Sequence, residues 1–202
     1  MKINSQEFNK SIYIPTPISY VKKGDVNQYF YPIVSYQGGS TQSGVAPGLD
    51  TLKTYPFIIA ASINVLEVIT RVNGGTAAGR TYRLGVYDDN GNCYPNKLIP
   101  FSDTGTYSAS STGVKTGVFA NTITLTPGLY WMTTNASNAT PSLRHISLNL
   151  SIPPVLGMKA DGTAFNTGWS VAFTYAAMPQ YFPTGATLHQ NANLIYGFKT
   201  SL

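Results

Sequence analysis

The sequence predicts an all-β protein, an antiparallel, jelly-roll-like β-sandwich preceded by an extended N-terminal arm. Three observations carry this prediction. Short β-branched and aromatic segments recur along the 202 residues, separated by Gly, Pro, Asn and Ser. Only 10% of the residues are charged, whereas long surface helices need many Glu, Lys and Arg side chains. No segment repeats its apolar residues at helical spacing.

Residues 1–27 differ from the rest of the chain and form the predicted arm. They contain IYIPTPISY (12–20), whose two prolines oppose a helix. No neighbouring segment would pair with this stretch, so we expect it to pack on another surface. Residues 28–202 have a length that suits one sandwich domain with one core.

The expected strands follow one another between polar loops. Residues 57–72 are long enough for two strands or one bent strand. Residues 80–88 alternate, with Tyr82, Leu84 and Val86 on one face and Arg83, Gly85 and Tyr87 on the other. The same alternation directs Tyr130 and Trp131 to opposite faces, one to the core and one to a surface. Further strands are expected at 28–36, 122–126, 129–134, 146–152, 171–175 and 194–198.

Charge and cysteine content restrict the class of protein. The net charge of +5 comes from 13 Lys and Arg against only eight Asp and Glu. The basic residues form no concentrated stripe, so we expect no nucleic-acid binding. The first ten residues lack the apolar stretch of a signal peptide, which predicts synthesis in a cytoplasm without export. No apolar run approaches a membrane span, and the single Cys93 excludes an intramolecular disulfide.

The chemistry-bearing residues predict no catalytic activity and no cofactor. The chain has no nucleophile elbow, zinc-protease motif, P-loop or dinucleotide fingerprint. Distant carboxylates that meet in space remain an open alternative. We expect His145 on the polar, exposed side of its strand and His189 in a loop, which gives no zinc-ligand spacing. We interpret residues 88–92 (DDNGN) as a tight turn. The alternative is a calcium loop, although the downstream Glu of such loops is missing.

Three segments in the middle of the chain form a recognisable pattern: 80–99, 102–107 and 122–134. An Arg-Leu-Gly-aliphatic-Tyr strand is followed by a Pro-x-x-Leu segment, an Asp-x-Gly turn and a Leu-x-Pro-Gly-x-Tyr-Trp strand. This pattern resembles the terminal β-domain of many bacteriophage fibre and virion structural proteins. Its residues here are Arg83, Leu84, Gly85, Val86, Tyr87, Pro95, Leu98, Ile99, Asp103, Gly105, Leu125, Pro127, Gly128, Tyr130 and Trp131.

The resemblance covers about residues 55–202 and includes VLGM (155–158) and AAMPQYFP (176–183), with Met178 where leucine is common. It implies a jelly-roll-like sandwich, usually a homotrimer, displayed on a virion as a fibre head, receptor-binding tip or decoration. It also implies that the matching residues are architectural, with glycines at close contacts or turns and Trp131 in a core. The resemblance carries over no binding site.

The arm then becomes the expected attachment to other virion proteins of the capsid or tail. The chain has no fibre shaft, which favours a short head fibre, a capsid decoration or a tail-tip knob. Ordering an extended arm costs on the order of 1–2 kcal/mol per residue, so buried side chains must offset this cost. The expected anchoring residues are Tyr13, Ile14, Pro15, Pro17 and Tyr20.

Two other functions compete with the virion protein. One is a carbohydrate-binding module or lectin-like adhesin that binds a host-surface glycan; the other, disfavoured by the scarce acids, is a depolymerising enzyme. Aromatic rings could stack on sugars, although the same residue types commonly fill sandwich cores. The candidate rings are Trp131, Trp169, Tyr94, Tyr107, Tyr181 and Phe182. Exposed loops at 105–113, 135–142 and 184–193 are where recognition is expected.

Overall fold

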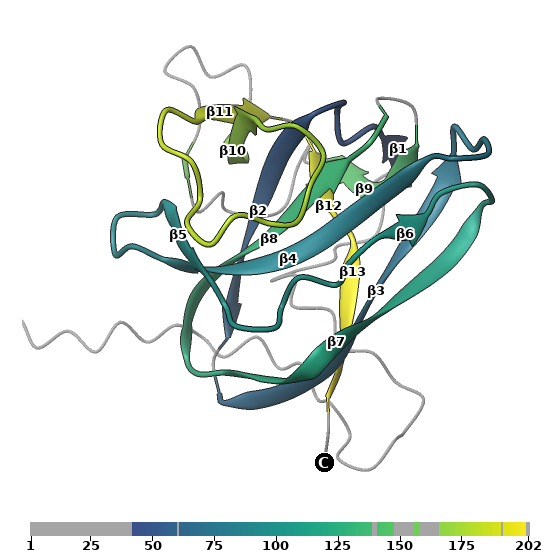
Figure 1. Cartoon of the computed structure of the whole chain (residues 1–202). Helices are drawn as coiled ribbons and strands as arrows, with labels where there is room; N and C mark the ends of the chain where they lie inside the picture. Colours follow the sequence, from purple (N-terminus) through teal and green to yellow (C-terminus); the bar gives the residue numbers. More distant parts are fainter. Residues whose placement is uncertain are drawn as a thin grey trace, which may run out of the picture.

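The computed structural model confirms an antiparallel β-sandwich (Figure 1). It describes residues 42–59, 61–138, 141–147, 156–157, 166–190 and 192–200, and no helix occurs among them. The predicted arm (1–27) and the strand expected at 28–36 lie outside the described residues.

The described part of the chain contains thirteen strands. In chain order they are β1 (Gln42–Val45), β2 (Thr51–Ile59), β3 (Ile63–Gly74), β4 (Thr81–Asp89), β5 (Pro95–Leu98), β6 (Tyr107–Ser108), β7 (Gly113–Leu125), β8 (Gly128–Ala136), β9 (Ser142–Ser147), β10 (Asn166–Ala172), β11 (Thr187–Gln190), β12 (Ala192–Leu194) and β13 (Tyr196–Thr200).

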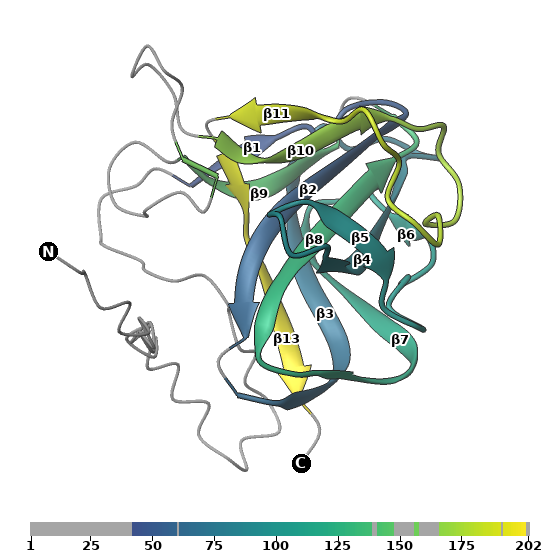
Figure 2. The same cartoon turned by 90° about the vertical axis from the view of Figure 1, so that its left-hand side faces the viewer.

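These strands form two antiparallel sheets, and the chain crosses between them repeatedly along its length (Figures 1 and 2). Sheet A contains β1, β9, β12, β13, β3 and β7. Sheet B has the order β11-β10-β2-β8-β4-β5, with β6 also paired to β4. The longest pairings are β3–β7 in sheet A and β2–β8 in the middle of sheet B.

Most of the predicted strands occur in the structure. Residues 57–72 belong to two strands, β2 and β3, which lie in different sheets. The prediction of a strand at 171–175 is wrong in its second half. β10 ends at Ala172, which pairs with Thr51 at the start of β2, and Phe173 lies outside the sheet. The prediction at 146–152 is tested only up to Ser147, where the described part of β9 ends.

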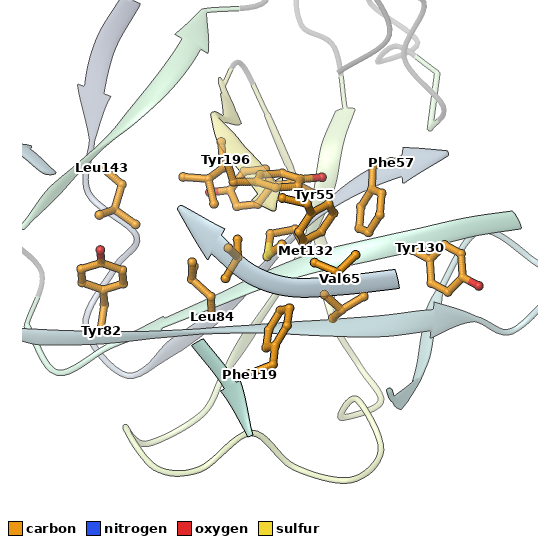
Figure 3. Packing of buried hydrophobic residues seen from close by; sticks show 14 of the residues in the cluster. Tyr55, Phe57, Val65, Tyr82, Leu84, Phe119, Tyr130, Met132, Leu143 and Tyr196 are labelled. Carbon is orange, nitrogen blue, oxygen red and sulfur yellow. The ribbon is translucent and has the colours of Figure 1, made fainter. Parts of the chain in front are cut away.

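The main core lies between the two sheets (Figure 3). As predicted, Tyr82, Leu84 and Val86 of β4 all point into it. Aromatic side chains meet in its centre, where the Phe57 ring packs on those of Tyr130, Tyr196 and Phe198 at centroid distances of 5.5–5.7 Å. Because these rings come from both sheets, their burial holds the sandwich closed.

A second hydrophobic cluster covers the outer face of sheet B. Tyr87 and Trp131 point outward from β4 and β8, but the segment 173–186 crosses over them. Met178 and Phe182 supply the covering side chains. Backbone hydrogen bonds from Leu98 to Gln180 and from Phe182 to Asn96 attach this segment to β5. We name residues 173–186 the covering segment.

Gly117 of β7 provides room for a core tyrosine. A Cβ atom at this position would overlap with the hydroxyl and ring of Tyr107. The Tyr107 ring is itself stacked on Tyr82, with a centroid distance of 5.1 Å, so it has no free direction in which to move. Gly85 of β4 is less constrained, because its Cβ would approach Met178 Cγ at 3.0 Å, and the methionine side chain is flexible.

We expect Gly117→Ala to destabilise the sandwich by about 3 kcal/mol or more, because the overlap displaces a stacked pair of rings. Gly85→Ala is the matched control and should cost less than about 1.5 kcal/mol, since Met178 can adopt another rotamer. Urea unfolding of both variants measures the difference. Equal costs would contradict the role of Gly117 as the space for Tyr107.

Candidate functional site

The residues of the sequence pattern lie around sheet B and its covering segment. Arg83 and Gly85 are on the outer face of β4, and Gly85 leaves space for Met178 of the covering segment. Tyr87 donates a hydrogen bond from its hydroxyl to the Pro179 carbonyl at 2.7 Å. Leu84 occupies the main core. The pattern therefore brings distant segments together in a packed structure.

Asp103 connects three of these segments through a single carboxylate. Its Oδ1 accepts hydrogen bonds from Arg83 Nε at 3.1 Å and from the Gly105 amide at 3.0 Å. Its Oδ2 accepts from Arg83 Nη2 at 2.8 Å and from the Met178 amide at 2.9 Å. This hydrogen bonding raises the pKa of Arg83 above its ordinary value. The carboxylate thus attaches both the 102–106 loop and the covering segment to β4.

The remaining pattern residues occupy turns and strand ends. Gly105 has a φ of 72°, in the left-handed region that favours glycine. Pro95 begins β5 and is buried, and Pro127 lies between β7 and β8. Gly128 begins β8, where a Cβ would come no closer than 3.6 Å to another atom. None of these residues forms a cluster of reactive groups.

Tyr130 and Trp131 point to opposite faces, as predicted, but neither lies on a surface. Tyr130 packs in the main core, and its hydroxyl donates to the Thr126 carbonyl at 3.0 Å. Trp131 has 0% exposure beneath the covering segment, and its Nε1 donates to Asp89 Oδ1 at 2.9 Å. The expected surface position is wrong because a distant segment covers that face.

Most of the candidate sugar-stacking rings are packed inside the protein. Tyr107 is buried in the main core, and Phe182 is buried in the cluster under the covering segment. Tyr94 and Trp169 lie partly buried against that cluster with a centroid distance of 4.9 Å. Only Tyr181 has a large exposed fraction, 57%, and it belongs to the covering segment.

The 88–92 turn uses its side-chain oxygens within the chain. Asp88 Oδ1 accepts from the Lys97 amide at 2.6 Å, and Asp89 Oδ2 accepts from the Gly91 amide at 2.7 Å. Asn90 Oδ1 accepts from the Asn92 amide at 2.8 Å. The bonds of Asp89 and Asn90 are typical of Asx turns, that of Asp88 joins the two strands of the hairpin, and together they account for the residue types without a metal. Across the described ranges, no three His, Cys, Asp or Glu side chains gather in a metal-binding arrangement.

Both histidines differ from their predicted positions. His145 was expected to be exposed, but it points between the sheets and has 0% exposure. His189 was expected in a loop, but it lies in β11. Tyr55 of β2 packs against both rings, with centroid distances of 5.6 Å to His145 and 5.1 Å to His189. The sequence could not show this, because three separate strands form the cluster.

Hydrogen bonds determine the neutral tautomer of each histidine. His145 Nδ1 lies 2.7 Å from the Leu143 carbonyl and therefore donates, so its Nε2 accepts from the Tyr55 hydroxyl at 3.1 Å. His189 Nε2 donates to the Thr54 carbonyl at 2.8 Å, and its Nδ1 accepts from Thr167. All four ring nitrogens have partners, which is the arrangement of structural core histidines.

Burial disfavours the charged form of both rings. It lowers the pKa of His145 to about 4, against the opposing hydrogen bond to the Leu143 carbonyl. It lowers the pKa of His189 to about 4 as well. The positive charge of Lys53 lowers both values further, and burial also lowers the pKa of Lys53 itself. The cluster is therefore neutral at its two imidazoles at pH 7.

The outer face of sheet A differs from that of sheet B. Within the described residues, both hydrophobic clusters lie elsewhere, between the sheets and under the covering segment. On β7, Val114 and Val118 point outward with exposed fractions of 56% and 64%. On β3, the register places Arg71 opposite Val114 and Glu67 opposite Val118. This face carries apolar and charged side chains side by side, as contact surfaces do.

The predicted anchoring residues, Tyr13, Ile14, Pro15, Pro17 and Tyr20, lie outside the described residues. The described part of the chain consists of strands and loops and contains no helix that could cross a membrane. The strongest candidate for a functional surface is therefore the outer face of sheet A.

We expect Asp103→Asn to cost about 2–3 kcal/mol, because the single amide oxygen can replace only one of the two carboxylate oxygens and the NH2 group then faces two donors. Lys199→Gln is the control, since Lys199 Nζ lies 3.0 Å from Glu67 Oε1 in an ordinary ion pair at the surface of sheet A. It should cost less than about 1 kcal/mol. Urea unfolding at pH 7 tests the ranking, and a reversed order would show that Asp103 does not hold the loops.

We also expect the free energy of unfolding to fall between pH 6.5 and pH 4. The folded pKa of each histidine, about 4, is below the unfolded value of 6.5, so the unfolded chain takes up protons first. The stability is complete above pH 6.5 and decreases by up to about 1.4 kcal/mol per pH unit for each histidine.

The chain contains only these two histidines, and between about pH 5 and pH 6.5 no other type of side chain has its ordinary pKa. His189→Gln should halve the slope between pH 6 and pH 5, whatever its effect on stability at pH 7. Chemical unfolding at several pH values measures the slope, and a flat profile for the unmodified chain would contradict the burial of neutral rings.

Comparison with known proteins assigns no family to this arrangement. No protein-family model matches the chain, and no curated protein matches it. The geometry of sheet A and the packing of sheet B are therefore the basis for any functional proposal.

Proposed function

We propose that this chain is a non-enzymatic structural protein of a bacteriophage particle. Its role is that of a short head fibre, a capsid decoration or a tail-tip knob, with residues 1–27 attached to capsid or tail proteins. The sandwich is displayed on the particle as an oligomer, with a host-surface glycan as a further binding partner. The sequence pattern that resembles such proteins motivates this assignment.

The observation that carries the proposal is the difference between the two outer faces. The pattern residues Arg83, Gly85 and Asp103 help to hold the covering segment on sheet B, so that face is filled by the chain itself. Sheet A presents Val114 and Val118 beside charged residues. A sandwich with one completed face and one contact face suits a building unit of an assembly.

The role of the pattern residues also supports a structural protein. They pack, turn the chain or accept backbone hydrogen bonds, and none is placed beside the histidine cluster. The described carboxylates each accept a hydrogen bond from their own chain, which suits a structural role.

Light scattering of the purified full-length chain tests the oligomer. We expect a stable species of three times the subunit mass over a wide concentration range. A monomer at all concentrations would remove the main structural implication of the resemblance. The carbohydrate-binding module would then be the better proposal.

Deletion of residues 1–24 tests the attachment. We expect the truncated chain to keep the unfolding transition of the sandwich but to be absent from purified particles. Normal incorporation of the truncated chain would contradict the role of the arm as the anchor.

A carbohydrate-binding module or lectin-like adhesin is the second candidate. It is favoured by Tyr181 and Phe101, which each expose 57% of their surface next to loops. A glycan array with the full chain separates the two functions. Binding that is lost in Tyr181→Ala but kept in Phe182→Leu would favour the module.

A further inference from the structure

A pocket of about 80 Å³ lies in the outer face of sheet A, lined by Ile69, Thr70, Arg71, Val114, Arg144 and Ile195. The lining residues come from β3, β7, β9 and the junction between β12 and β13. The pocket is therefore built across neighbouring strands of one sheet, and the pairing of these strands determines where its lining side chains lie.

The strand register explains why a hollow forms there. Ile69 is paired with Gly197 of β13, which has no side chain to stand beside it on the outer face. The residue opposite Ile69 on β7 is the small Thr116. Arg71 and Arg144 stand at the rim. The Ile195 amide donates to the Arg144 carbonyl at 2.9 Å, which places Ile195 beside Arg144. Ile69 forms the floor, with only 8% exposure.

Two guanidinium groups line this pocket, and neither has an acidic partner at ion-pair distance among the described residues. The ion pairs in the described part of the chain are Arg83–Asp103 and Glu67–Lys199, so neither rim arginine takes part in one. The Nε–H of Arg144 is buried and has no acceptor within the described ranges. A buried donor that lacks an acceptor destabilises the protein, and an anionic ligand would supply that acceptor.

The geometry points to a carboxylate on a short aliphatic stem as the ligand. Guanidinium groups bind planar carboxylates through two parallel hydrogen bonds. The apolar side chains of Ile69, Val114 and Ile195 suit the methylene groups of the stem. No aromatic ring lines the pocket, so it offers no stacking surface for a sugar ring.

We propose that this pocket binds an acidic side chain of a different protein. A second copy of this chain is a poorer source, because five of its eight acidic residues are described and all five already accept hydrogen bonds within their own chain. These are Asp50, Glu67, Asp88, Asp89 and Asp103. The net charge of +5 also favours an acidic partner over a like-charged copy.

The exposed valines extend the site beyond the pocket. Val114 lies at the pocket, and Val118 lies along the same strand on the same face. A partner segment with an acidic residue flanked by apolar ones fits this arrangement of charge and surface. The inference rests on the proposed function, since it names the chemistry of the partner that meets the contact face of sheet A.

The test is a titration of the ¹⁵N-labelled full chain, followed by NMR. The probe is acetyl-Val-Glu-Val-amide, and acetyl-Val-Gln-Val-amide is its neutral match. We expect the acidic peptide to shift the Arg144 Nε–H signal and the amides of Ile69, Arg71 and Ile195 with millimolar affinity. The neutral peptide should bind at least tenfold more weakly.

Two variants locate the effect. Arg71→Gln should lower the affinity for the acidic peptide by about tenfold. Because Arg71 is exposed, the substitution should leave the fold intact. Lys97→Gln removes the same charge from an exposed position on sheet B and should leave the affinity unchanged. Arg144→Lys, which keeps the charge but loses the planar fork, should also weaken binding.

Four results would overturn the inference. The first two are equal affinity for both peptides and no loss of peptide affinity in Arg71→Gln. The other two are the absence of any shift of these signals at about 50 mM peptide, and tighter binding of digalacturonate, an acidic disaccharide, than of the acidic peptide. Concentration-dependent shifts of the same signals without peptide would identify a second copy instead. These outcomes are separate from the oligomer mass and from particle incorporation, so the inference and the proposed function can fail independently.

Discussion

The carboxylate of Asp103 is the interaction on which the outer layer of the protein depends. It accepts two hydrogen bonds from Arg83, one from its own loop and one from the covering segment. Without these bonds, the covering segment would lose one of its attachments, and the cover over the rings of Tyr87 and Trp131 would be weaker. A charged group near the surface thereby helps to bury an apolar cluster that contains no charge itself.

Local patterns were sufficient to predict the sheets but not what lies on top of them. Alternation in β4 correctly separated Tyr82, Leu84 and Val86 from Arg83, Gly85 and Tyr87, because a strand places successive side chains on opposite faces. The same rule cannot say what covers the outward face. One of Tyr130 and Trp131 was expected at a surface for this reason, and the cover over Trp131 comes from residues far along the chain, in a segment without periodic structure.

The histidines and the arginine pocket show the same limit at single residues. The polar neighbours of His145 in sequence suggested an exposed side chain, yet the ring points between the sheets, where Tyr55 of another strand accommodates it. No short sequence motif contains both Arg71 and Arg144, and only the strand pairing of sheet A brings them together. Sites that form across a sheet have no short sequence signature, because each strand contributes one or two residues.

Pro56 of β2 has a consequence for the solubility of the protein. β10 pairs with β2 only at Thr51–Lys53, whereas β8 continues along the other side as far as Ile59. The middle of β2 is therefore an open edge of sheet B within the described residues, and proline has no amide hydrogen with which to extend a ladder. The proposed function places copies of this chain close together on a particle. A proline at this edge discourages strand-to-strand aggregation between them.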